Sequence, residues 1–183
     1  ELPTNGQFLS QKIPTDKINF LIHQKLEEKG LTIAQEAEKK ILIRRLYYTI
    51  IGLPPTPEEV QHFLADERPN AYELLVDNLL ASPHFGERWA RHWMDLVRYA
   101  EFKGHEFDYP ILGAWQYRDY LIRAFNTDIP YDQLIKEHLA GDLLNHPRIH
   151  PEKGTNESIH GTAFYTFGEG KHSPVDIRQE EAD

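Results

Sequence analysis

Apolar residues recur at helical spacing along most of the chain. Between residues 16 and 29, Ile18, Leu21 and Leu26 fall on one helical face, and Gly30 follows as a left-handed stop. Alternation of apolar and polar residues with a period of two is scarce. The same helical spacing predicts further helices at residues 34–50, 71–81, 83–100, 114–125 and 131–140, and a short element near 159–167.

Several helix starts are marked by capping residues. Thr56 precedes Pro57 and lies three residues before Glu59, which is the arrangement of a capping box with proline at the first helical position. The pair Asn70–Glu73 has the same spacing, and Ser82–Pro83 opens the next predicted helix. These signals mark the residues at which several of the predicted helices begin.

The fold expected from this pattern is all-α, an irregular multi-helix domain with long loops. Residues 1–15 read as an extended lead-in, and residues 16–183 as a single helical domain. Prolines and glycines interrupt the chain after Asp142, which predicts an irregular C-terminal segment. On the predicted helix 83–100, the side chains expected to face the core include Trp89, Trp93 and Leu96.

The composition narrows the class of protein. Twenty Lys and Arg against 29 Asp and Glu give a formal charge of −9, which argues against binding to nucleic acid. The 183 residues contain no cysteine, so disulfides, thiolate metal sites and covalent haem attachment are excluded within them. The best apolar run, Ile41–Leu46, is broken by Arg44 and Arg45, so no membrane span is expected.

Common catalytic motifs are missing from the sequence. It has no Gly-x-Ser-x-Gly elbow, phosphate-binding glycine-rich loop, dinucleotide fingerprint or His-Glu-x-x-His motif. This removes the commonest hydrolase, NTPase, dehydrogenase and metalloprotease interpretations. The chain begins at Glu1 rather than Met and shows no signal peptide, as expected of a processed or trimmed product.

The loop after the tryptophan-rich helix is the richest candidate for chemistry. It carries Glu101, His105, Glu106 and Asp108 around a glycine turn. Carboxylate and imidazole groups suit a divalent cation, with His105, Glu106 and Asp108 as its ligands, or an acid–base pair around a polar ligand. Ordinary loops collect the same residue types, so a purely structural loop is the alternative.

Residues on the neighbouring helices extend this candidate site. Arg98 lies on a polar face of the predicted helix 83–100, which reads equally as a solvated stripe of ion pairs. Trp115 and Arg118 lie on the following helix. Trp115 offers an aromatic wall. Arg118, beside Asp119, either joins one helix to another through ion pairs or binds a ligand.

Most of the ten histidines are expected to be structural. His138 shares a predicted helix with Leu134, which favours a hydrogen-bonded imidazole in or near the core. His146 and His150 have the spacing of a helical metal pair, but a proline follows each of them. A regular helix is therefore excluded there, and the pair is rejected as a metal site.

Several strings of residues together carry a family resemblance. They are Leu42–Leu46, Gly52–Val60, Leu79–Trp93, Asp95–Tyr99, Gly104–Asp108, Ala114–Tyr120, Pro130–Gln133, Ala140–Leu144 and His172–Arg178. They resemble the planctomycete cytochrome c-associated domain, a family of unknown function. The resemblance covers nearly the whole chain after the lead-in.

This resemblance implies an exported, multidomain parent protein in the periplasm or outside the cell. Members of the family typically carry a cytochrome c-like module before this domain and another uncharacterised domain after it. Soon after the stretch that matches Asp176–Asp183, they continue into a Cys-x-x-Cys-His motif resembling a c-type haem attachment site. Because this chain stops at Asp183, we expect it to be the front fragment of its parent, and any haem is implied for the parent alone.

Three hypotheses for the function remain open. The first is a redox or ligand-binding module that shapes a pocket beside a haem or metal. Its expected lining is Arg98, Glu101, His105, Glu106, Asp108, Trp115 and Arg118. Its expected partners are other domains of the parent and a small-molecule or carbohydrate ligand, since the family is associated with polysaccharide breakdown. The second is a glycan-acting enzyme with paired carboxylates from Glu101, Glu106 or Asp108. The third is a structural scaffold without its own activity.

Overall fold

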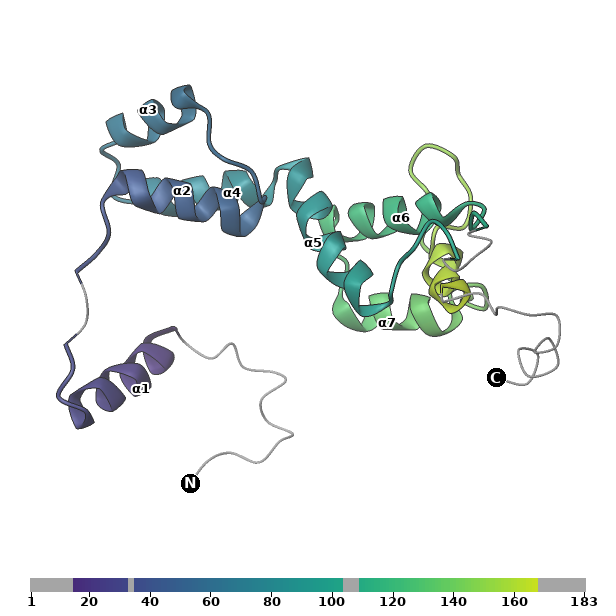
Figure 1. Cartoon of the computed structure of the whole chain (residues 1–183), viewed down its shortest axis with the longest axis horizontal. Helices are drawn as coiled ribbons and strands as arrows, with labels where there is room; N and C mark the ends of the chain where they lie inside the picture. Colours follow the sequence, from purple (N-terminus) through teal and green to yellow (C-terminus); the bar gives the residue numbers. More distant parts are fainter. Residues whose placement is uncertain (1–14, 33–34, 104–108, 168–183) are drawn as a thin grey trace. The chain divides into compact units, whose positions relative to one another are not determined.

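The computed structural model describes residues 15–32, 35–103 and 109–167, and this part is helical (Figure 1). Its elements in chain order are α1 Thr15–Glu28, α2 Lys39–Ile50, α3 Pro57–Ala65, α4 Ala71–Leu80, α5 Pro83–Leu96, α6 Ala114–Asn126, α7 Tyr131–Ala140 and the 3-10 helix η1 Ser158–Thr166. Within these ranges β pairing is limited to two isolated bridges, Phe102–Pro110 and Ile149–Asn156. The all-α fold predicted from the sequence is confirmed.

The chain divides into two compact units, residues 1–38 and residues 39–183. In the first unit, α1 ends at Glu28, and Gly30 follows as the expected left-handed stop, with a φ of 64°. The amide of Leu31 then donates to the carbonyl of Leu26 at 2.9 Å, which completes the helix end. Within this unit the apolar side chains of Ile18 and Leu21 are exposed.

Helices α2, α3 and α4 pack around one apolar cluster in the second unit (Figure 1). Its buried members include Ile43 and Tyr47 of α2, Phe63 of α3 and Leu79 of α4. The prediction that α2 begins near residue 34 is wrong, since the helix begins at Lys39. Its buried face begins at Ile43, so an additional N-terminal turn would have no core to cover.

The capping signals give mixed results. The capping box at Thr56 is confirmed: its amide donates to Glu59 at 2.7 Å, and its hydroxyl accepts from the Glu59 amide at 3.3 Å. The hydroxyl of Ser82 likewise accepts from the amide of His84. The cap predicted at Asn70 is wrong, because its side chain makes no capping bond and its φ and ψ of −106° and 23° are not those of an extended cap.

Helices α5, α6, α7 and η1 lie together in Figure 1. They form a second apolar cluster, whose buried members include Tyr117, Leu121 and Leu134. Helix α5 approaches α6 closely at Gly86. A Cβ there would lie 2.6 Å from the side chain of Asn126 and closer still to the Ile122 carbonyl. Only glycine fits this contact without moving the helices apart.

Helix α5 ends at Leu96, earlier than the predicted residue 100. Arg98 adopts a left-handed φ of 54°, and the amide of Tyr99 donates to the carbonyl of Met94 at 2.9 Å. This is the geometry of a Schellman helix end, formed without the usual glycine. The early end leaves Leu96 75% exposed, so its predicted core position is wrong.

Trp89 is also exposed rather than fully in the core. Its indole N–H donates to the carbonyl of Ile50 at 3.1 Å, which fastens α5 to the end of α2. Trp93, one turn further along, packs against the second cluster as expected. Among the described residues, no helix is both long enough and apolar enough to cross a membrane.

A buried carboxylate joins α6, α7 and η1. Glu137 is 0% exposed, and Arg148 binds it with two hydrogen bonds of 2.7 and 2.8 Å. Tyr120 donates to it at 2.7 Å, Ser158 at 2.9 Å and Gln133 at 3.0 Å. Each oxygen of the carboxylate therefore has at least two donors.

The electrostatic balance at Glu137 favours its charged form. Burial alone would raise the pKa of this carboxyl group, but hydrogen bonds from Arg148, Gln133 and Tyr120 outweigh it, and the pKa lies below its usual value. A fully buried charge of this kind is tolerated only while its partners are present.

We expect Arg148→Met to destabilise the protein by about 3–5 kcal/mol, because it leaves the Glu137 carboxylate buried without its counter-charge. Lys136→Met is the matched control, since it breaks an exposed ion pair with Asp132 on the same helix. Urea unfolding followed by circular dichroism measures both free energies. A similar, small change in the two variants would contradict the assigned role of the buried pair.

Candidate functional site

The loop between α5 and α6 has a fixed base. Its two stems are joined by the amide of Lys103 donating to Tyr109 at 2.9 Å and by the amide of Ile111 donating to Glu101 at 2.8 Å. The predicted metal ligands His105, Glu106 and Asp108 lie outside the described residues, so that set stays a prediction.

Glu101 is the centre of the polar groups at this base. Its Oε1 accepts a hydrogen bond from the Tyr99 hydroxyl at 2.9 Å and from Nη1 of Arg118 at 3.0 Å. Nε of Arg118 also pairs with Asp119 at 3.3 Å. Burial and the hydrogen bond to Glu101 raise the pKa of Tyr99 to about 12. Two predicted site residues, Glu101 and Arg118, are thus brought into direct contact.

Trp115 lies one turn before Arg118 on α6 and is 45% exposed. The ammonium group of Lys153 lies 5.6 Å from the centre of its indole ring. Arg98 is exposed, and among the described residues its side chain makes no hydrogen bond or ion pair. Its contribution here is the left-handed turn that directs the chain into the loop.

A second group of interacting side chains lies in the core and was only partly expected from the sequence. The predicted hydrogen-bonded core position of His138 is confirmed, since it is buried and its Nδ1 lies 2.7 Å from the carbonyl of Leu134. Its Nε2 contacts the indole nitrogen of Trp93 at 2.9 Å and the hydroxyl of Tyr117 at 2.8 Å. Burial lowers the pKa of His138, which keeps the ring neutral.

The two ring nitrogens of His138 have distinct roles. A carbonyl oxygen can only accept, so Nδ1 carries the proton in the neutral ring. Nε2 is then the acceptor for both Trp93 and Tyr117. The helical spacing showed that His138 faces the core, but not that two donors from other helices would converge on it.

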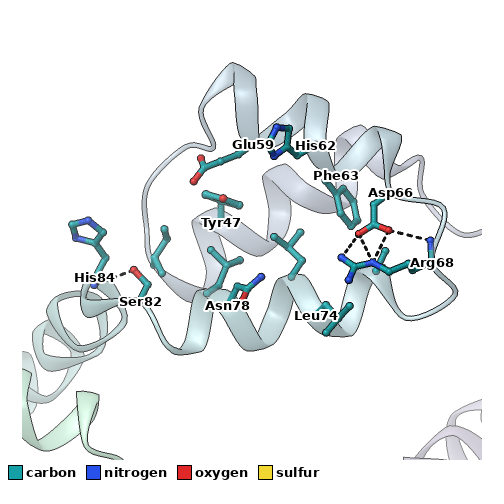
Figure 2. A pocket seen from close by; sticks show the side chains of 14 residues that line it. Tyr47, Glu59, His62, Phe63, Asp66, Arg68, Leu74, Asn78, Ser82 and His84 are labelled. Atoms are coloured by element: carbon teal, nitrogen blue, oxygen red, sulfur yellow. Dashed lines mark hydrogen bonds and ion pairs between the residues drawn. The ribbon is translucent and has the colours of Figure 1, made fainter.

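A cavity of about 500 Å³ lies between α2, α3 and α4 (Figure 2). Its lining combines apolar side chains such as Phe63 and Leu74 with polar ones, which are spread along its length from His84 at one end to the Asp66–Arg68 ion pair at the other (Figure 2). Burial and a hydrogen bond to Glu59 raise the pKa of Tyr47, on its wall, to about 12. The sequence pattern did not reveal this cavity, because its lining residues come from α2, α3, α4 and the start of α5.

Comparison with known protein families assigns the chain to one of them. Residues 17–183 match PSCyt2, a protein family of unknown function also designated DUF1549. The chain belongs to the PSCyt2 family. The match confirms the resemblance to the planctomycete cytochrome c-associated domain. Comparison with curated proteins gives no match, and comparison with solved structures gives none.

The PSCyt2 match includes the loop base, the His138 group and the cavity between α2, α3 and α4. All three therefore belong to the family domain rather than to an unrelated extension. Groups of three or more metal-ligating side chains do not occur within residues 15–32, 35–103 and 109–167.

We expect the free energy of unfolding at acid pH to depend on the protonation of His138. Burial also lowers the pKa of His160. As the pH is lowered, both histidines therefore take up protons at a higher pH in the unfolded chain than in the folded protein. The free energy of unfolding should therefore fall as the pH drops below 6.5, the ordinary value for histidine. Urea unfolding at a series of pH values measures this slope.

Two variants test whether His138 causes this change of the free energy of unfolding with pH. His138→Gln is expected to make it shallower, whereas His62→Gln, at an exposed position on α3, should leave it unchanged. Equal slopes in the wild type and the His138 variant would contradict the assignment of a neutral, buried imidazole.

Proposed function

We propose that this PSCyt2 domain is a ligand-binding module of an exported, cytochrome c-associated protein, and that it binds a polar, carbohydrate-like ligand at the base of the loop between residues 101 and 111. The observation that carries the proposal is the Glu101–Arg118 pair, held in place by Tyr99 beside the exposed ring of Trp115.

The pair retains capacity to bind a ligand. Within the described residues, Oε2 of Glu101 and Nη2 of Arg118 have no hydrogen-bond partner. One can accept from a hydroxyl group and the other can donate to one. Because Tyr99 and Asp119 hold the same two side chains, less conformational entropy is lost when a ligand binds.

Trp115 supplies the complementary apolar surface. Binding sites for small molecules combine an aromatic wall with a few polar groups that fix the orientation of the ligand. The flat, 45% exposed indole matches the C–H face of a sugar ring, and the Lys153 ammonium, which lies over the ring at 5.6 Å from its centre, offers a further donor. A polyhydroxylated ligand uses all of these groups, whereas a purely apolar one would leave the Glu101–Arg118 pair desolvated.

The arrangement favours binding over glycan hydrolysis. A glycosidase places one carboxylic acid opposite one carboxylate across the bond to be cleaved. Here the guanidinium of Arg118 pairs with both Glu101 and Asp119. Oε1 of Glu101 accepts hydrogen bonds from the Tyr99 hydroxyl and from Arg118. These donors stabilise the ionised carboxylate, whereas a catalytic acid must carry a proton that it can give up.

The proposal extends to the parent protein. His105, Glu106 and Asp108, in the sequence between Lys103 and Tyr109, would hold a divalent cation that adds oxygen-directed contacts to the ligand. A c-type haem would belong to other domains of a periplasmic or extracellular parent, with which this domain would associate. These features are supported by the sequence of the loop and by family resemblance.

Calorimetric titration with a neutral glucan oligosaccharide and with a uronic acid oligosaccharide tests ligand binding. Trp115→Ala and Arg118→Ala are each expected to weaken binding by about ten- to a hundredfold, as loss of a stacking surface or of a charged hydrogen bond does. Tyr72→Ala, which removes an exposed aromatic ring from α4, is the control and should bind normally. Absence of binding by the wild type to both oligosaccharides would overturn the carbohydrate-like ligand.

Titration with Mn²⁺ and with Ca²⁺ tests the cation separately. Glu106→Gln and His105→Ala are expected to abolish cation binding, because each removes one ligand of the proposed set. Glu152→Gln removes an exposed carboxylate outside the loop and should have no effect. Equal affinity in all three variants would remove the metal from the proposal and leave the oligosaccharide experiment unaffected.

A further inference from the structure

Aromatic side chains form a continuous row from the surface of α7 to the loop base. Tyr131 is 70% exposed, and its ring lies 6.2 Å from that of Trp93, centre to centre. The next steps are 5.2 Å from Trp93 to His138, 5.7 Å from His138 to Tyr117, and 6.3 Å from Tyr117 to Tyr99. Tyr99 then contacts Glu101 through its hydroxyl.

Each inner phenol of this row has a base positioned to receive its proton. The hydroxyl of Tyr117 lies 2.8 Å from Nε2 of His138, and the hydroxyl of Tyr99 lies 2.9 Å from Oε1 of Glu101. Loss of an electron makes a phenol strongly acidic, so a phenol is oxidised readily only where a neighbouring base can take the proton. His138 is suited to this, because its Nδ1–H is already bound to the Leu134 carbonyl and its Nε2 is an acceptor.

We propose that Tyr131, Trp93, Tyr117 and Tyr99 conduct a one-electron oxidising equivalent between the surface of α7 and the loop base. The oxidant is a metal-centred one-electron acceptor at the Tyr131 end. The reductant is an electron-rich organic molecule, such as a phenol or an enediol, at the Tyr99 end. This function does not depend on carbohydrate binding at the loop.

The electrons and protons balance at every step. The oxidant takes one electron from Tyr131, whose phenol proton passes to water at this exposed position. Trp93 then reduces the Tyr131 radical, which regains a proton from water, and Tyr117 in turn reduces the Trp93 radical cation, which has kept its N–H proton. As Tyr117 loses its electron, its O–H bond breaks and the proton moves to His138 Nε2, giving a neutral phenoxyl radical and an imidazolium. Tyr99 then reduces that radical, the imidazolium returns the proton to Tyr117, and the proton of Tyr99 moves to Glu101. The organic reductant finally gives one electron to Tyr99, Glu101 returns the proton to the Tyr99 oxygen, and the oxidised reductant loses its own proton to water.

The composition and a neighbouring tyrosine support this role. The chain has no cysteine and one methionine, so tryptophan and tyrosine are its most readily oxidised side chains. Tyr120 lies 5.9 Å from Tyr117 but is not placed to join the row, because its hydroxyl donates to Glu137. That carboxylate is paired with Arg148 and cannot take a proton without breaking a buried ion pair.

The absence of cysteine allows a photo-oxidant to be attached at one place. Asp132→Cys introduces a single thiol beside Tyr131, at a side chain that is exposed. A ruthenium polypyridyl complex coupled to that thiol, oxidised by a flash and an external quencher, then acts as the metal-centred acceptor on the full chain. Electron paramagnetic resonance of rapidly frozen samples detects the radicals formed.

We expect radicals on Tyr117 and Tyr99, identified by loss of their signals in Tyr117→Phe and Tyr99→Phe. Trp93→Phe should abolish both signals while leaving a radical on Tyr131, because it removes the only indole of the row. Tyr120→Phe and the distant Tyr72→Phe are the controls and should retain both. Phenylalanine keeps each ring, and circular dichroism checks that each variant is folded.

Two results would overturn the proposal. One is a radical confined to Tyr131 in the folded, labelled wild type, which would make the inner rings ordinary core packing. The other is an unchanged yield at Tyr117 and Tyr99 in Trp93→Phe, which would exclude the assigned route. Addition of ascorbate should shorten the lifetime of the Tyr99 radical, since ascorbate is an enediol reductant; an unchanged lifetime would exclude the loop base as the reducing end.

Discussion

The packing of the second helical cluster depends on one buried charge, the carboxylate of Glu137. Removing a carboxylate from water costs several kcal/mol, and only a complete set of partners offsets that cost. The partners come from α6, α7, η1 and the segment before η1, namely Tyr120, Gln133, Arg148 and Ser158. These elements must therefore dock together in one arrangement, which fixes the spacing of the residues that neighbour Glu137.

This rigid cluster supports the features to which we assign function. His138 follows Glu137 on α7, and Arg118 lies two residues before Tyr120 on α6, so both are positioned by helices that the buried pair holds together. The loop base, by contrast, is exposed and rests on that support. Binding groups on a loop carried by a rigid framework are a common arrangement in proteins, because the framework supplies precision and the loop supplies access.

Structural features could be predicted from the sequence where interactions between neighbouring residues determine them. The capping box at Thr56, the glycine stop after α1 and helix α7 follow from neighbouring residues and were predicted correctly. Glu137 and Arg148 could not be identified, since charged side chains normally face water and their burial depends on pairing across a turn. The end of α5 was missed because Arg98, rather than glycine, adopts the left-handed conformation. At the candidate site, the pairing of Glu101 with Arg118 required knowledge of how the loop returns to α6.

The separation in sequence of the Glu137 partners has a consequence for how the chain matures. Helix α7 is synthesised before Arg148 and Ser158, so a nascent chain that stops between them carries an uncompensated carboxylate on an apolar face. The cluster can close only after η1 has left the ribosome. Division of the gene between α7 and η1 would accordingly separate Glu137 from Arg148 and Ser158, two of the partners that compensate its buried charge.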